Sequence, residues 1–115
     1  MPSDCLFCRI VAGTTHADRV FEDDHVIAIR DINPQAPTHL LVMPREHVAS
    51  ARELGKTDGD LLGAAFAALA DLADREGISE RGYRIVTNVG EWGGQSVRHL
   101  HFHLIGGRQM SWPPG

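Results

Sequence analysis

Three histidines alternate with large apolar residues in the stretch His99-Leu100-His101-Phe102-His103-Leu104-Ile105. In a β-strand, successive side chains point to opposite faces of the sheet. A strand over residues 99–105 would therefore place three imidazoles on one face and apolar side chains on the other. One histidine on a strand is an ordinary residue, but three at a strict period of two indicate a functional site.

This row of imidazoles suits acid, base and nucleophilic chemistry. Neutral imidazole is both a nucleophile and a proton carrier near pH 7, so one ring can attack while another donates a proton or orients it. Metal binding is the competing use. Alternate residues of a strand lie about 6.6 to 6.8 Å apart, so the row by itself is poorly shaped to converge on one ion. An end histidine could still join ligands from elsewhere in the chain.

Four more strands are expected on the N-terminal side of this one. Residues 19–22 and 25–30 predict a β-hairpin, because two short β-prone runs flank an acidic turn. Two prolines within residues 31–37 favour a loop. The β-branched and apolar run 38–43 and the run 83–88 predict the third and fourth strands.

Two helices complete the expected fold. Apolar residues recur at helical spacing between residues 57 or 58 and 76, and Gly77 provides a stop. A shorter helix is expected over residues 5–12, ended by Gly13. The fold class is therefore α+β: a five-stranded antiparallel meander with one long helix and a short N-terminal helix.

Composition limits the kinds of protein this chain can be. Its 115 residues fit one domain, residues 1–115, which includes the tail 106–115. The formal net charge of −4 argues against nucleic acid as a partner. No window approaches the ~20 apolar residues of a membrane span, and the first residues lack an apolar signal core. We expect a cytoplasmic protein, in which the pair Cys5-Leu6-Phe7-Cys8 is a metal or redox element rather than a structural disulfide.

The stretch from His99 to Ile105 resembles the His-φ-His-φ-His-φ-φ signature of the histidine triad (HIT) superfamily, where φ is an apolar residue. Residues 31–39, the run Gly93-Gly94-Gln95-Ser96-Val97 and the tail 106–115 are similar to one branch of it, the Hint proteins, which are purine nucleoside phosphoramidases. Together these segments cover most of the domain.

The resemblance implies hydrolysis of P–N bonds in adenosine or guanosine 5′-phosphoramidates through a covalent nucleotidyl-histidine. By analogy, His101 is the nucleophile and His103 contacts the phosphate. His99 buttresses the site, and His39 on a neighbouring strand orients the nucleophilic ring. No cofactor is required for this chemistry.

The resemblance also assigns residues that bind the substrate. Gly94, Gln95 and Ser96 form a phosphate cradle, in which the Ser96 hydroxyl contacts the phosphate or the leaving group, and Asn88 contacts the phosphate. Asp31 accepts hydrogen bonds from the ribose hydroxyls. Candidates for the wall against the purine, each equally suited to the core, are Ile32, Phe7, Ile10, Phe21 and Ile29.

Some bacterial members of the superfamily carry a zinc site, and this chain has the corresponding residues. They are Cys5, Cys8, His47 in the context Pro44-Arg45-Glu46-His47, and His99. Four such ligands would close a tetrahedral site with no open position, so the zinc would be structural. The alternative is two reduced thiols packed against the sheet.

Family dimers pair the long helix and the fourth strand, so the resemblance implies a homodimer in which the tail with Trp112 reaches the partner's active site. Two other functions stay open. One is a dinucleoside polyphosphate hydrolase or nucleotidyl transferase of another HIT branch. The other is a noncatalytic nucleotide-binding scaffold.

Overall fold

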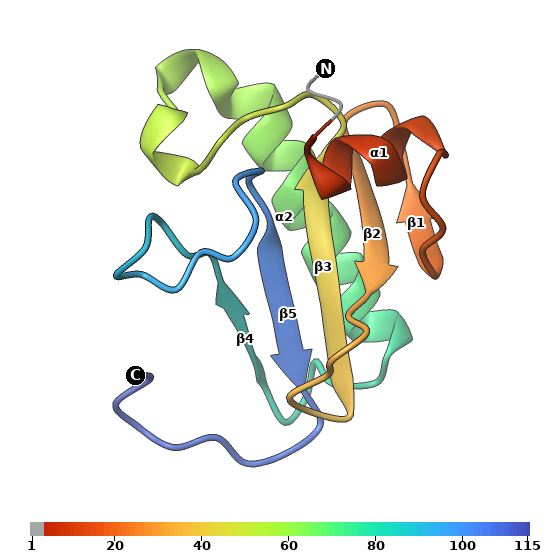
Figure 1. The fold of residues 1–115 in the computed structure, drawn as a ribbon. Helices are drawn as coiled ribbons and strands as arrows, with labels where there is room; N and C mark the ends of the chain where they lie inside the picture. Colours follow the sequence, from red (N-terminus) through yellow and green to blue (C-terminus); the bar gives the residue numbers. More distant parts are fainter. Residues whose placement is uncertain (1–3) are drawn as a thin grey trace.

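A computed structural model of the protein describes residues 4–115, and a five-stranded sheet forms its centre (Figure 1). The strands are β1 (Arg19–Glu22), β2 (Val26–Arg30), β3 (Thr38–Pro44), β4 (Tyr83–Val86) and β5 (Phe102–Gly106). Their order across the sheet is β1-β2-β3-β5-β4, and every neighbouring pair is antiparallel. The predicted α+β class with five antiparallel strands is confirmed.

The strand order departs from the predicted meander in one place. β5 lies between β3 and β4, although β4 precedes it in the chain. Leu104 of β5 is fully buried, whereas all four residues of β4 are only half-buried. β5 takes the central position because its alternate residues, including Phe102 and Leu104, are buried, and the less buried β4 is left at the edge.

The helices cover opposite faces of the sheet. In Figure 1, α1 (Leu6–Ala12) lies in front of the strands and α2 (Gly59–Arg75) lies behind them. Two short 3₁₀ helices, η1 (Ala51–Glu53) and η2 (Lys56–Asp58), precede α2. Gly13 ends α1 in the left-handed conformation, with a φ of 83°. Within residues 4–115, no helix is long and apolar enough to cross a membrane.

Two separate hydrophobic cores hold these layers together. Leu69 and Leu72 of α2 pack on one face of the sheet with Leu40 and Leu104. Phe7 and Ile10 of α1 pack on the other face with residues including Leu41. β3 contributes residues to both cores, so its sequence is a nearly continuous apolar run, whereas β5 contributes Phe102 and Leu104 to the core on the α2 side alone.

The histidine-bearing strand is shorter than predicted. β5 begins at Phe102, so His99 and His101 lie in the bent segment before it. Extending the β3–β5 register places Leu100 opposite Pro44, which has no N–H to donate. Pro44 therefore cannot donate to the Leu100 carbonyl, and its own carbonyl oxygen lies against His99 Nε2, so the Leu100 N–H donates to the Val48 carbonyl at 2.6 Å. The predicted separation of faces is nevertheless confirmed, since Leu100 joins the core on the α2 side and the His101 ring contacts α1.

Candidate active site

The His101 ring is buried and held in one orientation. It is 4% exposed, and it meets the Phe7 ring edge-on with centroids 5.0 Å apart. His101 Nδ1 lies 2.7 Å from the His99 carbonyl oxygen. Because a carbonyl only accepts, Nδ1 must carry the proton, and Nε2 keeps its lone pair. The local backbone thus selects the tautomer in which Nε2 carries the free lone pair.

The environment also keeps these histidines neutral. Burial lowers the pKa of His101, and the bond to the His99 carbonyl and the Asp31 charge only partly offset this. Burial, followed by the positive charges that His101 and His39 would carry, lowers the pKa of His103 to about 4. Both rings are therefore uncharged near pH 7, in the form that nucleophilic attack or proton donation requires.

A hydrogen-bonded relay fixes the third ring, His103. The Gln35 N–H donates to His39 Nδ1 at 3.0 Å, so the proton of His39 is on Nε2. His39 Nε2 lies 2.9 Å from His103 Nδ1 and 3.3 Å from Asp31 Oδ2. Since His103 Nδ1 accepts this proton, His103 keeps its own on Nε2 as a hydrogen-bond donor. Gln35 acts here through its backbone, a role that no side-chain pattern in the sequence could reveal.

Asp31, His39 and His103 are also close enough to be considered as metal ligands. A metal on His39 Nε2 would have to displace the proton that the Gln35 contact places there. The hydrogen bonds already use His39 Nε2, His103 Nδ1 and Asp31 Oδ2, so we interpret the trio as a hydrogen-bonded relay.

Glycine and amide side chains shape the loop between β4 and β5. A Cβ at Gly93 would lie 2.3 Å from the Val89 carbonyl oxygen, so only glycine fits there. Gly94 adopts a φ of +82°, and Asn88 Nδ2 donates to the Gly93 carbonyl at 2.6 Å. Ser96 follows this turn with an exposed side chain. The loop is a defined structure that presents Ser96 to solvent.

The Gln95 side chain serves this loop rather than an open binding surface. Its Oε1 accepts the Gly90 N–H at 3.0 Å, and its Nε2 donates to the carbonyls of Ala49 and Val97 at 2.7 and 3.0 Å. Both amide N–H groups are therefore occupied. The prediction that Gln95 binds substrate can hold only through the loop shape that its side chain maintains.

The predicted nucleoside-binding residues separate into two groups. Asp31 directly follows β2, and its Oδ1 accepts the Asn33 N–H at 2.8 Å. Ile32 beside it is fully exposed and free to contact a base. Among the other candidates for the wall, Phe21 packs with the core on the α2 side, and the residues buried in the core on the α1 side are Phe7, Ile10 and Ile29.

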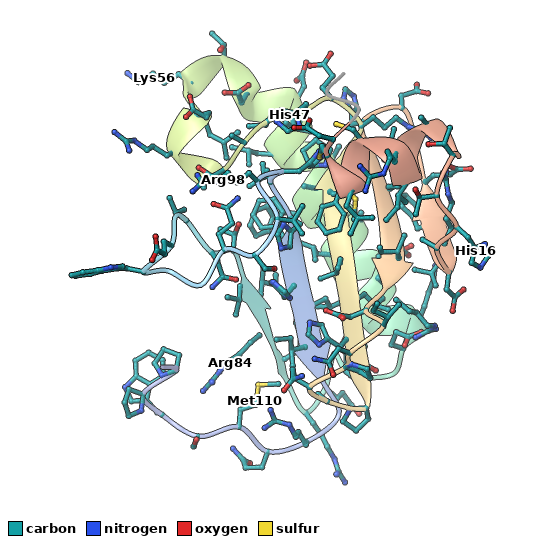
Figure 2. The ribbon with its side chains drawn as sticks, in the orientation of Figure 1. His16, His47, Lys56, Arg84, Arg98 and Met110 are labelled. Atoms are coloured by element: carbon teal, nitrogen blue, oxygen red, sulfur yellow. The ribbon has the colours of Figure 1, made fainter. Side chains whose placement is uncertain are left out.

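The four predicted metal ligands converge at the start of α1, where Figure 2 shows His47. Cys5 Sγ and Cys8 Sγ lie 3.4 and 3.5 Å from His99 Nδ1, and Cys8 Sγ lies 3.3 Å from His47 Nδ1. All four ligand atoms are within 4.8 Å of one another. The loop residue Ser96 lines the same small cavity as Cys5 and His47.

The protonation of this cluster fits a metal centre. His99 Nε2 lies 2.8 Å from the Pro44 carbonyl oxygen, so Nε2 carries the proton and Nδ1 offers its lone pair to the cluster. Burial lowers the pKa of His99, which keeps the ring neutral. Burial and the neighbouring Cys5 raise the pKa of the Cys8 thiol to about 11, so a metal ion would have to displace a proton to bind it. Two thiols and two imidazoles could bind one metal ion.

Comparisons with known proteins agree with this geometry. The HIT domain family matches residues 12–110, so the chain belongs to the HIT family. An uncharacterized HIT-like protein of Synechococcus elongatus is 45% identical over the full length of both chains. A solved HIT family hydrolase from Legionella pneumophila is 52% identical, with a TM-score of 0.95 over 97% of this chain and 100% of its own. A HIT family hydrolase from Clostridium thermocellum is 41% identical, with a TM-score of 0.93 over 96% of each chain. The protein thus has the fold of HIT family hydrolases. The match to the HIT domain family begins at residue 12, so it does not include Cys5 and Cys8.

Proposed function

We propose that this protein hydrolyses the P–N bond of purine nucleoside 5′-phosphoramidates, with His101 as nucleophile. In the first step, His101 Nε2 forms a bond to phosphorus, while the departing nitrogen takes the P–N electron pair and a proton from solvent. Water then attacks the nucleotidyl-histidine and gives a proton back to solvent, which releases the nucleoside monophosphate and returns the lone pair to Nε2. Dividing the displacement into two steps lowers each barrier.

The observation that carries this proposal is the hydrogen bond from His101 Nδ1 to the His99 carbonyl at 2.7 Å. It holds the ring of His101 in one tautomer before substrate arrives, so no rearrangement precedes the attack. The same bond satisfies the N–H of a buried ring and leaves Nε2 as the atom with a free lone pair. Its neighbour His103, with ring centroids 5.0 Å away, presents the Nε2–H that the relay maintains.

We assign the remaining predicted residues to binding around this pair. His103 Nε2–H stabilises negative charge on the phosphoryl oxygens, and the Ser96 hydroxyl contacts the phosphate or the departing group. The predicted phosphate cradle also includes Asn88, Gly94 and Gln95. Gln95 would contribute to it by maintaining the shape of the loop rather than by direct contact with the phosphate.

The nucleoside would lie at the mouth of the site. Asp31 has a half-buried carboxylate suited to ribose hydroxyls, and Ile32 offers an exposed apolar surface to the purine. The carboxylate of Asp31 would then link the ribose to the relay through His39.

We further propose that Cys5, Cys8, His47 and His99 hold a structural zinc ion. When bound, it would tie α1 to the segment that precedes β5, because its ligands come from both. With four protein ligands it has no open position for water and takes no part in the hydrolysis.

We also propose that the protein is a cytoplasmic homodimer. β4 is an edge strand, and the nearby apolar side chains of Phe66 and Val89 are 46% and 43% exposed. An unpaired edge beside exposed apolar side chains is suited to pairing with a second copy. Light scattering at micromolar concentration should give twice the 12.6 kDa chain mass, and a monomer would contradict the proposal.

The decisive experiment compares wild type with His101→Asn on adenosine 5′-phosphoramidate. The variant should lose turnover, keep AMP affinity within about tenfold, and form no nucleotidyl-enzyme in mass spectra after rapid quenching. Activity above a few per cent of wild type would reject His101 as the nucleophile.

Two further results would assign a different function. A higher kcat/KM for a dinucleoside polyphosphate than for the phosphoramidate would place the protein among the polyphosphate hydrolases. Binding of AMP by the wild type without turnover of either substrate would indicate a nucleotide-binding scaffold.

A further inference from the structure

The indole of Trp92 is fully exposed in the turn between β4 and β5. No ring or cation contact holds it among residues 4–115. Gly93 and Gly94 follow it directly, so the ring belongs to the same turn that presents Ser96 to solvent. A buried tryptophan removes on the order of 150–250 Å² from water, so a partner that covered this ring would gain most of that area.

The direction in which this loop extends indicates which partner could cover it. The loop between β4 and β5 and the tail both extend past the open edge of β4, one at each end of the strand (Figure 1). In the homodimer proposed above, both protomers would use this edge, and identical edges related by a two-fold axis meet antiparallel. The six residues after β4 (87–92) then lie beside the six residues before β4 (77–82) of the partner. Trp92 of one protomer therefore faces the partner's turn between α2 and β4.

That turn borders a cavity of about 610 Å³, whose other wall is the tail. The residues of the turn and of β4 that line it include Gly77, Ile78, Arg81, Gly82 and Arg84. The volume is within the range of small-molecule sites, so an indole fits inside. Arg84 already lies over the Trp112 ring of its own tail, with the guanidinium carbon 6.0 Å from the ring centroid. The cavity therefore has the apolar and guanidinium surfaces against which aromatic rings pack.

The charges of the two surfaces are also complementary. Glu91, next to Trp92, is exposed and forms no ion pair within residues 4–115. The described residues that line the cavity include three arginines, with Arg108 in the tail, and no carboxylate. Insertion of Trp92 would bring the Glu91 carboxylate to these guanidinium groups, where a charge-assisted hydrogen bond can form.

We propose that Trp92 of each protomer inserts into the partner's cavity between the α2–β4 turn and the tail. This inference rests on the proposed homodimer, and it makes each loop that carries Ser96 depend on the other protomer. Because Gly93 follows Trp92 directly, the inserted indole fixes one end of the proposed phosphate cradle. Trp92 is thus a positioning residue, since it acts on the reaction only through the loop.

Fluorescence quenching tests whether the indole is covered in the dimer. In Trp112→Phe, Trp92 is the remaining tryptophan. Acrylamide should quench it several-fold less at protein concentrations where light scattering gives a dimer than after dilution to the monomer. The control is His16→Trp in a Trp92→Phe, Trp112→Phe background, because His16 is exposed and lies on the side of the molecule away from β4 (Figure 2). Quenching of the control should be strong at both concentrations.

A double-mutant cycle tests the contact itself. Trp92→Ala should raise the dissociation constant of the dimer about tenfold or more, as truncation of a central interface tryptophan does. Arg84→Gln should also weaken the dimer, and the combined effect should be smaller than the product of the two single effects, because both changes remove the same contact. Arg19→Gln is the control, since Arg19 lies on β1 at the opposite edge of the sheet. It should leave the effect of Trp92→Ala unchanged.

Turnover of adenosine 5′-phosphoramidate tests the effect on the loop, at protein concentrations that keep every variant dimeric. Trp92→Ala should lower kcat several-fold, because the loop that carries Ser96 loses its support. Trp92→Phe should recover most of this loss, since a smaller aromatic ring can still enter the cavity.

Each result has a distinct meaning for the proposal. A monomer at every concentration would overturn this proposal together with the homodimer. In a dimer, quenching of Trp92 as strong as that of the His16→Trp control, or independent effects of Trp92→Ala and Arg84→Gln, would overturn the insertion alone. Protection of Trp92 by AMP but not by dimerisation would place the ring at the protomer's own site, and would equally overturn it. An unchanged kcat in dimeric Trp92→Ala would reject the positioning role.

Discussion

Acidification should destabilise the protein through His103. The folded structure lowers the pKa of this ring to about 4 from an ordinary value of 6.5, so the native state disfavours the charged form. The unfolded chain therefore binds the proton more readily between these two values. The stabilising effect of a neutral His103 is fully present above pH 6.5 and is lost as the pH falls toward 4.

The size of the effect follows from the two pKa values. A difference of about 2.5 units corresponds to about 3 kcal/mol when the transition is complete, at 1.36 kcal/mol per unit. Between pH 7 and pH 5, the linkage relation gives a loss of about 2 kcal/mol from this one group. That is a substantial share of the stability of a domain this small.

Urea unfolding of metal-free protein at pH 7 and pH 5 measures this loss. The comparison is with His103→Gln, which keeps a polar side chain but cannot titrate. The free energy of unfolding should fall by about 2 kcal/mol less in the variant than in wild type. Groups distant from His103 titrate in the same way in both proteins, so the difference reports His103 together with its interactions with His101 and His39. Equal losses in the two proteins would refute the lowered pKa and the neutral relay built on it.

Three further predictions concern the loop and the metal cluster. Gly93→Ala should destabilise the protein by about 1–3 kcal/mol and lower turnover, because the added Cβ meets the Val89 carbonyl. Gly55→Ala is the control and should do neither, since a Cβ there meets nothing within 4 Å. Equal melting temperatures of the two variants would contradict this prediction. Cys5→Ser should remove stoichiometric zinc in elemental analysis and lower the melting temperature, while an unchanged melting temperature would indicate ordinary thiols. Ser96→Ala should reduce kcat by about 10²–10³, less than loss of the nucleophile, and the reverse order of effects would exchange the two roles.

Much of the fold could be predicted from short-range patterns. The period of two in residues 99–105 separated imidazoles from apolar residues correctly, because side-chain alternation is a property of extended backbone itself. The sequence predicts the ends of both helices to within two residues. Gly13 and the helical spacing of apolar residues before Gly77 are signals that lie within or next to the helices themselves. The pairing of Cys5 and Cys8 with His47 and His99 came from resemblance, and the structure places all four together.

Only the tertiary structure shows how the candidate groups are protonated and held. The insertion of β5 between β3 and β4 depends on which strand buries more surface, which no window of sequence reports. The tautomers of His101 and His39 are set by a carbonyl and an N–H of the backbone, groups that every residue carries. The resemblance predicts that Gln95 binds substrate, but its amide donates to the carbonyls of the distant Ala49 and the nearby Val97. Local sequence determines which side chains can share a face of the sheet. Hydrogen bonds between distant segments determine the protonation of those side chains and whether they are available to a ligand. Such bonds exist only once the chain has folded, so the sequence does not reveal them.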